Sequence, residues 1–255
     1  MNFTALTYEL SARGVATITL NRPERGNALN HTAIDELGER FVHCALANAV
    51  RVVVLRGAGK HFCAGADMGG RDSDLAPAKF TLASMMEAVD TCAKPVIAVV
   101  QGAAVGGGFA LASACDVILA APEAFFSIPE VRLGMAPSPV LSALFLRAVG
   151  YRHFRRYGFS GERIAAARAF EMGFVSEVAP LAELEARAGA LCDAMLRGAP
   201  HALAELKQRV AEYGVPPASK LYAPESRDAK HMRSAEAEEG VAAFKEKRVP
   251  HWYKA

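Results

Sequence analysis

The sequence predicts an α/β fold with a largely parallel sheet and helices packed outside it. Three apolar runs carry this prediction, namely Val52–Arg56, Val96–Val100 and Val117–Ala121. None of them alternates with polar residues, which is typical of strands buried on both faces. Stretches with helical spacing of apolar residues separate the runs. Such alternation of strands and helices favours a parallel sheet.

The N-terminal half begins with a predicted hairpin. Leu6–Leu10 and Val15–Leu20 alternate on either side of a Ser-Ala-Arg-Gly turn. Asn30-His31-Thr32 offers N-cap residues for a following helix. We expect a second helix to open at Pro77 and a further short strand at Phe125–Ile128.

The C-terminal half is predicted to be mainly helical from Pro139 onward. A helical stretch at Arg163–Met172 ends at Gly173, and a short strand at Phe174–Val178 follows it. Two amphipathic helices at Leu181–Arg197 and Pro200–Tyr213 come next, and charged helical segments complete the chain.

Composition narrows the function classes. The chain has 255 residues and a net charge of +2, which argues against a dedicated nucleic-acid binder. No apolar run is long enough to span a bilayer. The five cysteines lack a Cys-x-x-Cys pair, and the histidines show no metal-ligand spacing. We therefore expect a cytoplasmic protein with free thiols, no bound metal, and neither membrane nor nucleic acid as a partner.

The most informative stretch is the apolar strand that ends at Gly102 and is followed by Gly106-Gly107-Gly108 and a small-residue helix. A glycine turn that opens a helix presents unpaired N–H groups and the positive end of the helix dipole. Such a turn binds an anion, or an oxygen that becomes one during a reaction. The spacing matches neither a dinucleotide fold, a P-loop nor a hydrolase elbow. Close packing of strand and helix could also select these glycines.

A second strand-end loop, Ala58–Met68, is also small and glycine-rich. Together with Leu20-Asn21-Arg22-Pro23 and Pro129-Glu130-Val131-Arg132-Leu133-Gly134, the two loops resemble the crotonase (enoyl-CoA hydratase/isomerase) superfamily. The resemblance runs from Val15 to Arg248 and looks closest to the bacterial methylglutaconyl-CoA hydratase-like branch.

The resemblance implies a crotonase-like spiral of ββα units over residues 1–195, which would hold the acyl-CoA site. Residues 196–255 would form a C-terminal helical region that serves as a lid and builds a homotrimer, or a hexamer of two trimers. Coenzyme A would enter only as part of the thioester substrate, and no cofactor would be permanently bound.

The resemblance also implies catalytic roles for three residues. The backbone N–H groups of Ala66 and Gly107 would hold the thioester oxygen, and Glu130 would move the proton. Glu130 follows a proline at a strand end among apolar residues, where the pKa of a carboxyl rises toward the range of a general acid or base. The family's second glutamate, however, is replaced by Ala110. This departure predicts a site with one carboxylate.

Substrate-binding positions are carried over in the same way. They are Arg25, Ala64, Asp67, Met68, Gly106, Phe244 and Lys247. Specificity for the acyl group is expected from the loop Gly69–Ala76, from Pro137–Leu141 and from the closing helices.

The predicted function is addition of water to an α,β-unsaturated acyl-CoA through a thioester enolate. With one glutamate, a Δ3,Δ2-enoyl-CoA isomerase or an acyl-CoA decarboxylase on the same fold remains an alternative. A non-catalytic acyl-CoA- or RNA-binding protein is the alternative from another class. The Ser-His-Asp peptidases that share the spiral are not supported, because Ala103-Ala104-Val105 supplies no nucleophile.

Overall fold

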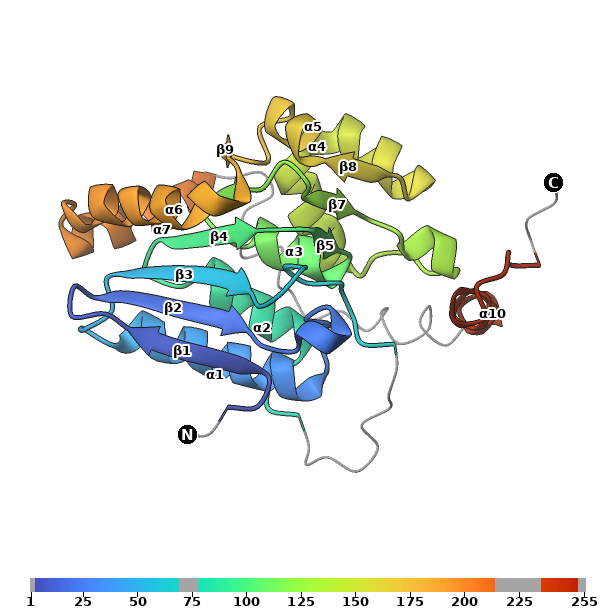
Figure 1. Cartoon of the computed structure of the whole chain (residues 1–255), viewed down its shortest axis with the longest axis horizontal. Coiled ribbons are helices and arrows are strands. Elements are labelled where there is room, and N and C mark those ends of the chain that lie inside the picture. Colours follow the sequence, from blue (N-terminus) through green and yellow to red (C-terminus); the bar gives the residue numbers. More distant parts are fainter. Residues whose placement is uncertain (1–2, 69–77, 214–234, 252–255) are drawn as a thin grey trace.

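A computed structural model shows an α/β chain built on two sheets (Figure 1). It describes residues 3–68, 78–213 and 235–251. The larger sheet has the strand order β1-β2-β3-β4-β6-β9. Its strands are β1 (Leu6–Leu10), β2 (Val15–Leu20), β3 (Val52–Gly57), β4 (Val96–Val100), β6 (Val117–Ala120) and β9 (Glu177–Val178).

The large sheet is parallel except at its first edge. β1 pairs with β2 in the antiparallel sense, with Tyr8 opposite Ile18, and every later pair is parallel. The predicted hairpin and parallel sheet are thereby confirmed. β9 is shorter than the predicted strand over residues 174–178, because Phe174 and Val175 instead donate their N–H groups to the Ala169 carbonyl at the end of a helix.

A smaller sheet of three strands stands beside the large one. It has the order β5-β7-β8, formed by β5 (Ala103–Val105), β7 (Phe125–Ser127) and β8 (Arg163–Ala165). The prediction of helix from Arg163 onward is wrong for β8, which pairs antiparallel with β7, Ser127 opposite Arg163. β5 was not predicted. β7 lies within the strand predicted at Phe125–Ile128, whereas β5 and β8 are defined by their pairing with it.

Helices cover both faces of the large sheet. The helices are α1 (His31–Leu46), α2 (Leu82–Asp90), α3 (Gly107–Ser113), α4 (Pro139–Ser160), α5 (Ala166–Glu171), α6 (Leu181–Leu196), α7 (Pro200–Tyr213) and α10 (Ala235–Lys245). Two short 3₁₀ turns, η1 (Pro23–Arg25) and η2 (Glu130–Leu133), complete the described elements.

The uninterrupted apolar strands are explained by two hydrophobic clusters. On β3, Val53 and Leu55 join a cluster with α1, α2 and α3, whereas Val52 and Val54 join a second cluster with α6. Successive side chains of a strand point to opposite faces. Because both faces are covered, both sets must be apolar.

Capping side chains set where two helices begin. The Asn30 side chain accepts a hydrogen bond from the Ala33 N–H at 2.9 Å, which confirms the predicted N-cap of α1. α2 begins at Leu82, because Thr81 and Ser84 form a capping box. The predicted start at Pro77 lies outside the described residues, and Phe80 precedes the helix.

The C-terminal helix α10 packs against η2, and it lies at the right-hand edge of Figure 1. The approach is close, since a Cβ built on Gly240 would lie 2.4 Å from the Leu133 carbonyl oxygen. Arg248 follows the helix and pairs with Glu239 at 2.7 Å. The predicted division at residue 195 falls next to the end of α6 and stays a prediction. No helix within the described ranges has the length and apolar character to cross a bilayer.

Candidate active site

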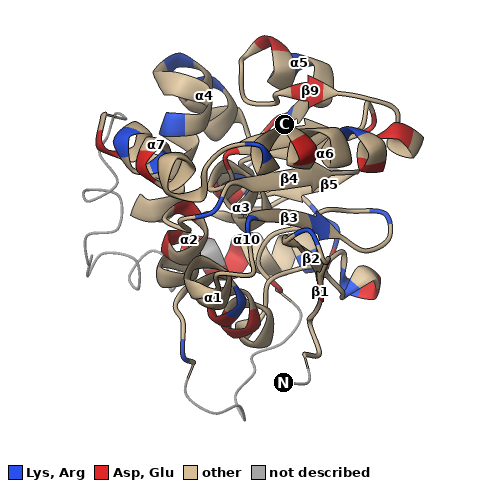
Figure 2. Ribbon diagram, turned by 90° about the vertical axis from the view of Figure 1, so that its left-hand side faces the viewer, with Lys and Arg blue, Asp and Glu red and all other residues tan. Residues whose placement is uncertain are grey.

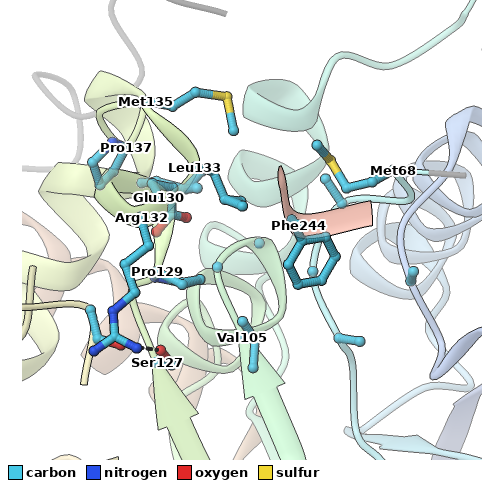
Figure 3. A pocket seen from close by; sticks show the side chains of 18 of the residues that line it. Met68, Val105, Ser127, Pro129, Glu130, Arg132, Leu133, Met135, Pro137 and Phe244 are labelled. Atoms are coloured by element: carbon cyan, nitrogen blue, oxygen red, sulfur yellow. Dashed lines mark hydrogen bonds between the residues drawn. The ribbon is translucent and has the colours of Figure 1, made fainter. Parts of the chain in front are cut away.

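A cavity of about 1000 Å³ opens where the small sheet, α3, η2 and α10 meet. Its walls include two backbone loops, the Glu130 side chain and the Phe244 ring (Figure 3). The glycine turn of residues 106–107 and the Ala66 loop, which lie far apart in the sequence, reach this cavity together.

The loop that carries Ala66 is held by backbone pairing on both sides. Cys63 pairs with Ala104, and Ala66 forms a parallel bridge with Leu29. In that bridge the Leu29 N–H donates to the Gly65 carbonyl, and the Asp67 N–H donates to the Leu29 carbonyl. Alternate peptide groups of an extended chain point to opposite sides. The Ala66 N–H therefore points away from Leu29, on the side of the cavity that Ala66 lines.

The glycine turn supplies the second N–H group. Gly106, the N-cap of α3, has φ +52° and ψ −115°, a conformation that favours glycine, and its N–H donates to the Ser127 carbonyl. Gly107 is the first residue of α3, so its N–H has no carbonyl one turn earlier within the helix. A Cβ built on Gly107 would lie 4.0 Å from the Ala66 nitrogen, which places the two donors side by side.

Glu130 faces this pair of donors from η2. A Cβ built on Gly106 would come within 2.9 Å of its Oε1 atom. Within the described part of the chain, the buried Oε2 atom has no hydrogen-bond partner. Loss of solvation on burial raises the pKa of the Glu130 carboxyl to about 7. Both protonation states are thus accessible near neutral pH.

Ala110 lies in the second turn of α3 and is fully buried. It supplies no titratable group. The carboxylates among the lining residues are Glu130 and Asp67, and Asp67 is paired with Arg22 at 2.8 Å. Glu130 is the carboxylate that faces the two backbone donors.

Most of the predicted binding positions meet at the cavity. Arg25, Ala64, Asp67, Met68, Gly106 and Phe244 all line it, as do Ala66, Gly107 and Glu130. Lys247 does not line it, and Arg248 does. The reason is local, because α10 ends at Lys245 and Lys247 takes a positive φ of +54°, so that the chain turns and the next side chain is directed to the site.

Some functional positions were missed from sequence. Arg132, Arg163 and Ser127 also line the cavity, and nothing in their local sequence indicates it except that Arg132 lies two residues after Glu130. The expected specificity segment of residues 137–141 contributes Pro137, Ser138, Pro139 and Leu141. The loop of residues 69–76, named with it, lies outside the described residues.

Arg22, from the Leu20-Asn21-Arg22-Pro23 motif, anchors the Ala66 loop, a role that the sequence did not indicate. Its guanidinium donates to Asp67 and to the Ala28 carbonyl, and both charged side chains of the pair are largely buried. We expect Arg22→Met to lower the free energy of unfolding by roughly 2–3 kcal/mol, since Asp67 loses a charged hydrogen-bond partner. Urea unfolding checks this. Arg13→Met is the control, because its pair with Asp193 is exposed and should contribute less than about 1 kcal/mol. Equal losses in the two variants would contradict the anchoring role.

Comparison with known proteins agrees with this geometry. Residues 11–255 match the family model for enoyl-CoA hydratase/isomerase. A probable enoyl-CoA hydratase of Rhodobacter capsulatus is 35% identical over 99% of both chains, and one of Bacillus subtilis is 33% identical over 93% of this chain and 95% of that protein. The chain belongs to the enoyl-CoA hydratase/isomerase family.

Solved structures confirm the predicted crotonase fold. An enoyl-CoA hydratase from Mycobacterium avium subsp. paratuberculosis superposes with a TM-score of 0.89 at 30% identity, covering 99% of this chain and all of that one. An enoyl-CoA hydratase/isomerase from Pseudoalteromonas atlantica gives a TM-score of 0.88 at 29% identity, covering 98% of this chain and all of that one. The family acts on thioesters of coenzyme A, and its hydratases are hydro-lyases.

Two polar residues that do not line the cavity make hydrogen bonds within the fold. The His61 Nδ1 atom accepts a hydrogen bond from the Ala103 N–H, and Asp116 accepts from the Val96 N–H and pairs with Lys207. Burial raises the pKa of the Cys63 thiol to about 12, so this residue is not a thiolate nucleophile. Groups of three or more His, Cys, Asp or Glu suited to a metal ion do not occur among the residues that the structure describes.

Proposed function

We propose that this chain adds water to α,β-unsaturated acyl-CoA thioesters with Glu130 as its single catalytic carboxylate. The observation that supports this most strongly is the meeting of three groups in one cavity. These are two adjacent backbone donors, at Ala66 and Gly107, and a buried carboxyl of raised pKa. The pair of N–H groups fits an oxygen that gains negative charge, as the thioester oxygen does in an enolate.

In the proposed reaction, Glu130 takes a proton from water as the water oxygen bonds to the β-carbon. The π electrons move toward the thioester, and the resulting enolate oxygen accepts hydrogen bonds from Ala66 and Gly107. Glu130 then gives the proton to the α-carbon, so that one water is added and the enzyme is regenerated. Each donor lowers the barrier by roughly 3 kcal/mol, because it is oriented before the charge develops.

The missing second carboxylate bears on the substrate. With Ala110 in place of a glutamate, α3 supplies no carboxylate opposite Glu130 to steady the water. A carboxylate on the acyl group can take over that task. We therefore propose a branched dicarboxylic enoyl-CoA of the 3-methylglutaconyl type as substrate, in agreement with the branch that the sequence motifs resemble. Assembly as a trimer or hexamer is proposed on the family resemblance alone.

Isomerisation is the second candidate, favoured by the same single carboxylate. One group suffices to carry a proton from C4 to C2 of a 3-enoyl-CoA. A purely nucleic-acid-binding role has less support, since acidic and basic residues are interspersed over the described helices, α7 among them (Figure 2).

Mass spectrometry of thioesters incubated with the protein separates these candidates. The panel is crotonyl-CoA, a 3-enoyl-CoA and 3-methylglutaconyl-CoA. We expect a gain of one water, fastest on the dicarboxylic thioester. Unchanged mass with a shifted double bond would make the protein an isomerase, and no turnover of any thioester would overturn the enzymatic proposal.

The pH dependence of kcat/KM should follow the titration of the Glu130 carboxyl. Because its base form starts hydration, we expect kcat/KM to fall about tenfold per pH unit below pH 7 and to level off above it. Steady-state rates between pH 5 and pH 9 measure this. If kcat/KM instead falls around pH 4.5, the ordinary pKa of a glutamate, a buried carboxyl would not be the group that acts as the base.

A further inference from the structure

The lining of the cavity includes several basic side chains. Arginine side chains line it at four positions, 25, 132, 163 and 248. Arg248 is neutralised by Glu239 and Glu246. Arg25 lies beside Ala64, whose N–H donates to the Gly26 carbonyl, and belongs to the side of the cavity proposed for coenzyme A. Arg132 and Arg163 are the two lining arginines that neither of these explanations covers.

Arg132 and Arg163 are brought together by the small sheet. Arg163 stands opposite Ser127 in the β7–β8 pair. The buried Ser127 hydroxyl donates to the Gly161 carbonyl at 3.3 Å, and a Cβ built on Gly161 would lie 2.7 Å from the Arg132 Nε. In Figure 3 the Arg132 side chain extends from beside Glu130 toward Ser127, away from Met68 and Phe244. The two arginines thus belong to the wall beyond Glu130.

Both guanidinium groups keep hydrogen-bond donors available. Arg132 uses its Nε to bind the Ser160 carbonyl at 2.8 Å, which leaves its two terminal nitrogens. Arg163 lies over the Phe125 ring at 4.3 Å, a contact that fixes the side chain without using any of its N–H groups. Neither arginine forms an ion pair with a carboxylate of the described residues. Two oriented guanidinium groups without a counter-charge suit a carboxylate.

We infer that Arg132 and Arg163 form the subsite that binds a carboxylate at the far end of the acyl group. This inference rests on the proposed acyl-CoA function and deepens it, since it names the residues that select an acidic acyl chain. The resemblance gives Met68 and Phe244 to coenzyme A, so a thioester held by Ala66 and Gly107 would direct its acyl end past Glu130 toward the arginines.

The test compares binding of two saturated thioesters, glutaryl-CoA and butyryl-CoA, by calorimetry. They differ in the terminal carboxylate and require no turnover. We expect the wild-type protein to bind glutaryl-CoA more tightly, by roughly 10- to 100-fold, the usual range for hydrogen bonds to a charged group. Arg163→Gln should lose most of this preference, and the double variant Arg132→Gln/Arg163→Gln should lose all of it. Affinity for butyryl-CoA should stay the same.

Arg155→Gln is the matched control. Arg155 is also exposed and lies over aromatic rings, those of Tyr151 and Phe159, but it does not line the cavity. It should leave the preference for glutaryl-CoA intact. Circular dichroism and thermal unfolding of each variant check that the fold is retained.

Three results of the binding test would overturn the inference. The first is equal affinity of the wild-type protein for the two thioesters. The second is a preference for glutaryl-CoA that persists in the double variant. The third is that Arg163→Gln lowers the affinity for both thioesters and for free coenzyme A by the same factor. The third result would mean that Arg163 contacts coenzyme A and not the acyl group. Hydration of enoyl thioesters without an acidic preference would overturn this inference alone. A preference for glutaryl-CoA without any hydration would overturn the hydratase proposal alone.

Discussion

Glu130→Gln is expected to lower kcat for hydration by roughly 10²- to 10⁴-fold, the usual contribution of a general acid–base group. Glutamine keeps the volume and one oxygen of the side chain but cannot carry the proton. Steady-state kinetics on the best thioester of the panel measures the loss. Glu123→Gln is the control, because Glu123 is an exposed glutamate seven residues earlier and should leave kcat unchanged.

The same variant separates catalysis from stability. The folded protein holds the Glu130 proton more tightly than the unfolded chain does, since the pKa is raised from 4.5 to about 7. Wild-type stability should therefore fall as pH rises through that window. Because Gln carries no charge, Glu130→Gln should be at least as stable as wild type at pH 8. A variant that unfolds more readily at that pH, or that keeps its full kcat, would contradict the assigned role.

Gly106→Ala is expected to lower kcat/KM by roughly 10²-fold or more, comparable to losing an oxyanion donor. Two effects combine. An alanine at φ +52° and ψ −115° is strained, and its Cβ would come within 2.9 Å of the Glu130 Oε1 atom. Both the Gly107 donor and the carboxyl would have to shift. Kinetics and urea unfolding are measured together, with a loss of stability of roughly 1–3 kcal/mol expected from the backbone strain.

Two glycine controls isolate the effect of the site. Gly173 also has a positive φ, +76°, but a Cβ there would meet nothing within 4 Å, so Gly173→Ala reports strain alone. Gly189 lies inside α6 and also meets nothing, so Gly189→Ala should be neutral or slightly stabilising. If Gly173→Ala reduced kcat/KM as much as Gly106→Ala, the account of the glycine turn would be wrong.

The large sheet was predictable because its strands are long and their apolar patterns are local. The hairpin of β1 and β2 matches its predicted bounds, and Asn30 caps α1 as its residue type indicates. Of the small sheet, only β7 was predicted, as part of the expected strand Phe125–Ile128. β5 and β8 have three residues each and are defined by pairing with β7. The residue pattern within such a short strand does not indicate which distant strand it pairs with.

The candidate site was predictable where family motifs cover it. Ala66, Gly107 and Glu130 meet in one cavity as the resemblance implies. Their catalytic roles remain predictions. Lys247 does not line the cavity, whereas Arg248 does, because a positive φ after α10 changes which side chain faces it; the binding role of Lys247 stays a prediction. Arg132 and Arg163 could not be paired from sequence, since only the β7–β8 register and the end of α4 bring them to one wall.

The central claim is that Glu130 and the two backbone donors together form and stabilise a thioester enolate. Exchange of α-hydrogens of butyryl-CoA in D₂O tests it most directly, because exchange needs one base and an enolate but no added water or particular acyl group. Mass spectrometry should show deuterium entering butyryl-CoA with wild-type protein, more slowly with Gly106→Ala, and at the uncatalysed rate with Glu130→Gln. Exchange that persists in Glu130→Gln, or its absence with wild-type protein at saturating butyryl-CoA, would contradict the claim.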